Sequence, residues 1–229
     1  MNINENTVVI ACMMIEDEVN EALRRHDLDL PIMWVNRGFH DKPARLCREL
    51  QHRIDLAEER GYTRILLAFG LCGGGVAGLK TKRACIAIPK FDDCINLMLC
   101  TGRRCRRGYA KGGVMYLTRG WCADEAARIP NLKESYIRQF GERRGKRLLK
   151  VMYDSYHTVC MVDTESYPLG EIEDIALETA NELGLELRKE QGSVEALEKL
   201  FTGNWDSDIL VVQAGGEIQQ SDFNWELGD

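Results

Sequence analysis

Short apolar segments alternate with longer amphipathic segments along the chain, and this alternation is the feature that most restricts its fold. Short runs rich in β-branched residues are typical of buried parallel strands, and parallel strands need a crossover, usually a helix, between them. The segments between the runs place apolar residues at helical spacing, as Leu46, Leu50 and Ile54 do. The pattern therefore predicts an α/β fold of the three-layer αβα type with a mostly parallel sheet. The predicted strands are residues 7–13, 32–36, 64–69, 84–89, 113–118, 158–163, 185–189 and 208–213.

The order of these segments predicts two halves. Residues 1–112 and 113–216 each have the pattern of a Rossmann-like βαβαβ unit, and we expect a cleft between the two units, with residues 217–229 as a polar C-terminal tail. No apolar run approaches the roughly 20 residues of a membrane span, and the first residues lack the basic start of a signal peptide. We therefore predict a cytoplasmic protein without a membrane partner. The net charge of -6 argues against nucleic acid as a partner.

Two of the nine cysteines follow directly on predicted strands. Cys72 lies in a glycine-rich run after residues 64–69, and Cys94 comes soon after residues 84–89. The carboxyl ends of parallel strands meet at one edge of a sheet, which is where ligands bind in α/β folds. Gly73, Gly74 and Gly75 would let the backbone approach a bound cofactor closely. A helix that starts at Cys94 would lower the pKa of its thiol and favour the thiolate that a metal requires.

These positions predict a metal centre that Cys72 and Cys94 share. We expect Cys12, which closes the first strand, as the third ligand, with His40 or Cys122 as alternatives. Three thiolates would suit an iron–sulfur cluster of the 4Fe–4S type, whereas a set of His40, Cys72 and Cys94 would suit zinc. Each of these cysteines could instead be a small core residue. Asp93 and His40 are the candidates for a catalytic acid or base beside the metal.

A cluster of arginines provides a candidate site for an anion. Arg103 and Arg104, followed by Arg106 and Arg107, lie in a turn-rich stretch of an acidic chain. Guanidinium groups bind phosphate and carboxylate groups through paired hydrogen bonds, so this stretch is predicted to bind an anionic substrate. The alternative is a solvated loop or a contact with an acidic subunit surface.

Several of these segments together resemble an uncharacterised family, domain of unknown function 1638. The resemblance lies in Ile10-Ala11-Cys12, Gly70-Leu71-Cys72-Gly73, Asp93-Cys94-Ile95 and Tyr116-Leu117-Thr118-Arg119-Gly120-Trp121, and it runs from about Val8 to about Asp163. The family has no established reaction. Its association with corrinoid-dependent methyl transfer implies a corrinoid or a methyltransferase protein as a partner.

The residues and the resemblance lead to one functional hypothesis with two alternatives. We expect an enzyme with an iron–sulfur cluster, whose open iron binds a small anionic or a sulfur- or methyl-bearing substrate. The first alternative is a zinc-dependent thiol- or methyl-transfer protein. The second is a module that binds a metal, a corrinoid or a small molecule without turnover. In each case the chain could act as a homo-oligomer.

Overall fold

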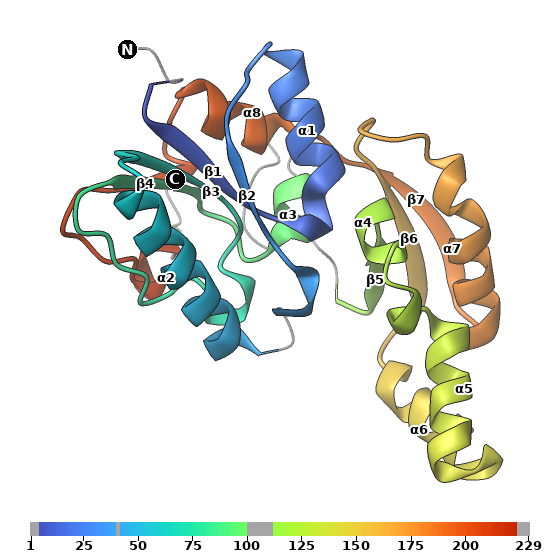
Figure 1. Ribbon diagram of the computed structural model, residues 1–229. Coiled ribbons are helices and arrows are strands. Elements are labelled where there is room, and N and C mark those ends of the chain that lie inside the picture. Colours follow the sequence, from blue (N-terminus) through green and yellow to red (C-terminus); the bar gives the residue numbers. More distant parts are fainter. Residues whose placement is uncertain (1–4, 40–41, 100–111, 224–229) are drawn as a thin grey trace. The chain divides into compact units, whose positions relative to one another are not determined.

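The computed structural model describes residues 5–39, 42–99 and 112–223, which fall into two compact units. Unit 1 comprises Met1–Tyr109 together with Ser193–Asp229, and unit 2 comprises Ala110–Gly192. Figure 1 shows the helices and strands of both units. Among the described helices, none combines the length and the apolar character that a membrane span requires.

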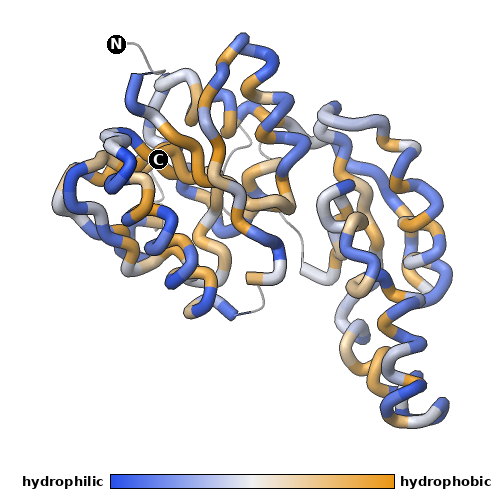
Figure 2. Tube along the Cα trace, in the orientation of Figure 1, coloured by the Kyte–Doolittle hydropathy of each residue, from blue (hydrophilic) through white to orange (hydrophobic). Residues whose placement is uncertain are grey.

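Unit 1 is built on a five-stranded sheet with the strand order β2-β1-β3-β4-β8. The first four strands are parallel: β1 (Thr7–Cys12), β2 (Ile32–Val35), β3 (Arg64–Ala68) and β4 (Cys85–Pro89). The fifth, β8 (Ile209–Val212), runs antiparallel beside β4. Every residue of β1 is buried, as expected for a central parallel strand that is covered on both faces. In Figure 2 these central strands are coloured as hydrophobic.

Helices cover both faces of this sheet. α1 (Glu16–Arg25) and α8 (Glu195–Thr202) pack together on one face, and α2 (Pro43–Glu59) lies on the other (Figure 1). α2 begins with a proline in its first turn, where the missing N–H costs no hydrogen bond, and it buries the stripe of Leu46, Leu50 and Ile54. Unit 1 is thus a Rossmann-like three-layer αβα fold, and the predicted fold class is confirmed.

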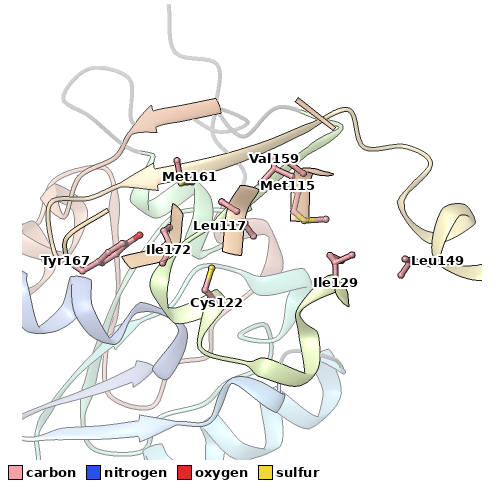
Figure 3. Close-up of a cluster of buried hydrophobic side chains, with 11 residues drawn as sticks. Met115, Leu117, Cys122, Ile129, Leu149, Val159, Met161, Tyr167 and Ile172 are labelled. Atoms are coloured by element: carbon pink, nitrogen blue, oxygen red, sulfur yellow. The ribbon is translucent and has the colours of Figure 1, made fainter. Parts of the chain in front are cut away.

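Unit 2 has a parallel three-stranded sheet with the order β5-β6-β7. Its strands are β5 (Val114–Leu117), β6 (Thr158–Asp163) and β7 (Glu186–Gln191), and its helices are α4 (Arg119–Cys122), α5 (Ile129–Phe140), α6 (Glu142–Tyr153) and α7 (Gly170–Leu183). α5 and α6 pack at very close range, because a Cβ on Gly145 would lie 2.7 Å from the backbone nitrogen of Ile137. The core of the unit is a cluster of buried side chains that includes Leu117, Val159 and Ile172 (Figure 3).

The eight predicted strands all exist, with ends within two residues of the predicted ones, but they are distributed differently from the expected halves. After Gly192 the chain returns to unit 1, so that α8 and β8 complete the first sheet. Part of the expected polar tail also packs on unit 1. Ile218 and Phe223 are buried, and the N–H of Ile218 donates to the carbonyl of Leu79. The predicted cleft between the halves stays a prediction.

One buried carboxylate holds the connection between β3 and β4 against α2. Oε1 of Glu58 accepts hydrogen bonds from the hydroxyl of Thr81 at 2.7 Å and from the backbone N–H groups of Lys82, Arg83 and Ala84 at 2.8, 2.7 and 2.9 Å. Burial raises the pKa of Glu58, but these four hydrogen bonds outweigh it and lower the pKa from 4.5 to about 2. Ionised Glu58 therefore stabilises the fold above pH 4.5, and this contribution is lost as the pH falls toward 2.

We predict that Glu58→Gln lowers the free energy of unfolding by roughly 2 kcal/mol at pH 7, because an amide oxygen accepts these hydrogen bonds without the charge. The difference from the unchanged protein should shrink toward pH 3, where the unfolded chain already holds the proton. Urea unfolding at both pH values measures it. Glu59→Gln, at the exposed neighbouring position, is the control and should have little effect at either pH. An equal loss at both pH values for Glu58→Gln would contradict the electrostatic explanation.

Candidate metal centre

Three cysteines lie at the carboxyl ends of three neighbouring parallel strands. Cys12 is the last residue of β1, Cys72 follows the end of β3, and Cys94 follows the end of β4 as the first residue of α3 (Cys94–Met98). β1, β3 and β4 are consecutive in the sheet, so the segments that carry the three thiols leave it at the same edge. We refer to Cys12, Cys72 and Cys94 as the cysteine edge.

The segments that carry Cys72 and Cys94 are pinned to each other through the backbone. The N–H of Leu71 donates to the carbonyl of Phe91 at 2.7 Å, and the N–H of Cys72 donates to the carbonyl of Asp92 at 2.9 Å. Gly70 makes this contact possible, because a Cβ there would lie 2.7 to 2.8 Å from the backbone atoms of Asp93. The spacing between these two segments is therefore fixed by the backbone alone.

Cys72 adopts a backbone conformation that is rare for its residue type. Its φ is 48°, in the left-handed region, and Gly73 and Gly74 follow with φ of 65° and 92°. A left-handed conformation costs a residue with a Cβ about 1–2 kcal/mol, and such strain is concentrated at functional sites. Gly75 is required for a different reason, since a Cβ there would lie 2.6 Å from the side chain of Leu46 on α2. Gly73 and Gly74 thus permit the left-handed backbone of the turn, and Gly75 permits close packing against α2.

The three thiols interact electrostatically. Burial raises the pKa of Cys12 and of Cys72 to about 12 and that of Cys94 well above its ordinary value. The second-largest contribution to each pKa comes from another thiol of the cysteine edge. The pKa of Cys12 is raised by Cys94, the pKa of Cys72 is raised by Cys12, and the pKa of Cys94 is raised by Cys72. The three sulfur atoms are therefore close enough to affect one another's ionisation.

Backbone N–H groups partly offset these effects. The N–H of Met14 donates to Sγ of Cys12 at 3.3 Å, and the N–H groups of Gly70 and Cys94 lower the pKa of Cys72. The N–H of Cys94 at the start of α3 lowers the pKa of its own thiol, as expected of a helix start, but other contributions outweigh it. α3 has only five residues, and burial, Cys72 and Asp93 together raise the pKa of Cys94.

Three charged side chains lie around the cysteine edge. Glu18, in the first turn of α1, is 1% exposed and raises the pKa of Cys94. Arg37, just after β2, lowers the pKa of Cys12. Asp93, a predicted catalytic residue, caps α3: its Oδ1 accepts a hydrogen bond from the N–H of Asn96 at 2.7 Å. Sequence reasoning missed Glu18 as a site residue, although its place in the first helical turn after β1 was the available signal.

The remaining sequence-predicted site residues have different outcomes. His40, Arg103 and Arg104 lie outside the described residues. Cys122 is buried in the core of unit 2, where Figure 3 shows it among apolar side chains. None of the seven cysteines that the structure describes forms a disulfide. Within residues 5–39, 42–99 and 112–223, no group of three or more His, Cys, Asp or Glu side chains is placed to hold a metal ion.

One protein-family model matches the chain. Its description is "Protein of unknown function (DUF1638)", and it covers residues 34–201, which include Cys72 and Cys94 and begin after Cys12. No curated protein and no solved structure shows significant similarity to the chain.

We predict that Gly70→Ala lowers the free energy of unfolding by about 1–3 kcal/mol, because its Cβ would force the backbone of Asp93 away. Thermal or urea unfolding measures the change. The matched control is Gly170→Ala at the start of α7, where a Cβ has no atom within 4 Å and φ is not positive. Equal stability of the two variants would show that the two loops can separate without cost.

Proposed function

The chain belongs to the DUF1638 family of proteins of unknown function, and we propose that its cysteine edge holds an iron–sulfur cluster in a cytoplasmic enzyme. The observation that carries this proposal is the convergence of three thiols from three consecutive parallel strands. Cys12, Cys72 and Cys94 come from separate segments, lie at the edge where α/β folds bind ligands, and raise one another's pKa.

A metal centre explains why three such thiols are placed together. Three thiolates in a partly buried site repel one another, and their burial is costly unless a cation compensates the charge. A bound metal provides this compensation and displaces the thiol protons. The nearby carboxylate of Glu18 raises the pKa of Cys94 further and so adds to the need for positive charge. The left-handed strain at Cys72 is consistent with a ligand role that fixes its position.

The spacing of the strands favours a cluster over a single ion. Neighbouring strands lie about 4.8 Å apart, so the ends of β1 and β4, which flank β3, are separated by roughly 9–10 Å. Ligands spread over such a distance suit a cluster, in which each thiolate binds a different iron. Backbone N–H groups directed at the sulfurs, such as that of Met14, also influence the reduction potential of clusters. Three ligands on four irons leave one iron open to substrate.

The substrate that we propose for the open iron is a small anion or a molecule bearing a sulfur or methyl group. Arg37 supplies a guanidinium group close enough to lower the pKa of Cys12, and such a group binds carboxylate or phosphate. Arg103 and Arg104 stay candidates for the same task. A cytoplasmic location agrees with the seven described cysteines, none of which forms a disulfide. A corrinoid or methyltransferase protein stays the proposed protein partner.

We predict that protein purified without oxygen contains about four irons and four sulfides per chain and absorbs visible light as iron–sulfur proteins do. Cys72→Ser and Cys94→Ser should each lose most of the iron and the absorbance while far-ultraviolet circular dichroism stays unchanged, because the cysteine edge lies at the rim of the sheet. Iron and sulfide analysis with visible spectroscopy provides the measurement.

Cys47→Ser is the matched control, since Cys47 lies on α2 and its thiol donates to the carbonyl of Ala77. It should retain the iron. If the analysis finds zinc without sulfide, and both variants lose the zinc, the iron–sulfur proposal is replaced by the zinc-dependent alternative. Retention of all metal in both Cys72→Ser and Cys94→Ser would refute a metal centre at the cysteine edge.

A further inference from the structure

The exposed large hydrophobic side chains of the described residues all lie on the helices of unit 2. Phe140 ends α5 and is 37% exposed, Val151 and Met152 lie near the end of α6 and are 67% and 49% exposed, and Leu177 on α7 is 48% exposed. Single exposed apolar residues are ordinary, but a group confined to neighbouring helices marks a surface that another molecule can cover. The charges around these residues indicate which molecule.

α6 combines its exposed apolar residues with positive charge. It carries five basic residues and one acidic residue, Glu142. Arg144, Arg147 and Val151 follow one another at spacings of three and four, so they share one stripe of the helix. The guanidinium of Arg144 lies 5.6 Å from the centre of the Phe140 ring, which extends this stripe onto α5. We refer to Phe140, Arg144, Arg147 and Val151 as the basic stripe.

α7 presents the opposite charge around its own exposed leucine. Asp174, Leu177, Glu178 and Asn181 share a stripe at the same helical spacing and line a shallow hollow of about 430 Å³ together with Glu182. All four residues of the stripe are exposed, and among the described residues neither Asp174 nor Glu178 has an ion-pair partner. We refer to Asp174, Leu177, Glu178 and Asn181 as the acidic stripe.

The two stripes are complementary in charge, and each carries exposed apolar side chains. The α6 part of the basic stripe, from Arg144 to Val151, and the acidic stripe, from Asp174 to Asn181, each cover two helical turns. The basic stripe places Val151 beside two guanidinium groups, and the acidic stripe places Leu177 between two carboxylates. Opposite charges fix the register of such a contact, and the exposed apolar residues of the two stripes supply the burial.

We propose that the chain forms a two-fold dimer in which the basic stripe of each copy docks on the acidic stripe of the other. Two-fold symmetry makes the contact twice and uses both stripes of both copies. Nucleic acid fits the surface less well, because phosphates would leave Val151 and Leu177 uncovered and would be repelled by α7, which bears five acidic residues and no basic ones. This inference is independent of the metal centre.

Charge reversal provides the test. In the variant Arg144→Glu/Arg147→Glu both stripes are negative and repel each other. In the variant Asp174→Lys/Glu178→Lys both stripes are positive and also repel. Each variant alone should therefore dimerise at least tenfold more weakly than the unchanged chain. An equimolar mixture should recover dimers, because each heterodimer restores both attractive contacts. Sedimentation equilibrium at low and high salt measures the association, which should weaken at high salt.

Arg48→Glu/Arg60→Glu, at exposed positions on α2 and directly after it, is the control of equal charge change and should leave dimerisation unaffected. Circular dichroism verifies that every variant is folded. A chain that stays monomeric at all accessible concentrations would overturn the proposal, as would reversal variants whose mixture fails to dimerise. A monomeric chain could instead bind a polyuridine oligonucleotide and lose this binding in Arg144→Glu/Arg147→Glu. That result would overturn the dimer proposal in favour of nucleic acid as the occupant.

Discussion

The geometry of the cysteine edge depends on the close contact between the backbone of Gly70 and that of Asp93. Parallel pairing brings the ends of β3 and β4 to the same edge, but it does not fix where the following loops go. The hydrogen bonds Leu71 N–H to Phe91 O and Cys72 N–H to Asp92 O do so. These bonds require two backbones to meet without a side chain between them, and glycine is the residue that permits this. The positions of two thiols thus follow from one missing Cβ.

The electrostatics of the cysteine edge differ between its protonated and ionised forms. With pKa values raised by burial and by one another, the thiols are neutral near pH 7 and cost little to bury. Ionisation of all three creates repulsion that a buried carboxylate, Glu18, increases. A metal centre reverses this balance, because thiolates and carboxylate then surround positive charge. The protonated thiols therefore suit the metal-free fold, whereas the proposed metal centre would require their ionised forms.

The sequence predicted the strands and the cysteine edge well, because both depend on local patterns. A β-branched run identifies a strand, and the residue that follows it must lie at a sheet edge, as Cys72 and Cys94 do. The raised pKa of Cys94 was not predictable, since it depends on burial and on Cys72, which is distant in sequence. The place of Glu18 in the first turn after β1 was visible in the sequence, but its proximity to Cys94 arises from the packing of α1 beside the sheet.

The two compact units have other bounds than the two expected sequence halves, for a topological reason. The pattern β6-α7-β7-α8-β8 repeats that of β1-α1-β2-α2-β3, yet α8 and β8 close the first sheet. Unit 2 is instead an insertion between α3 and α8. Ser193, the first residue after unit 2, lies beside the end of α3, because its N–H donates to the carbonyl of Met98 at 2.7 Å. The chain thus returns to unit 1 beside the short helix that begins with Cys94, and from there α8 and β8 complete the first sheet.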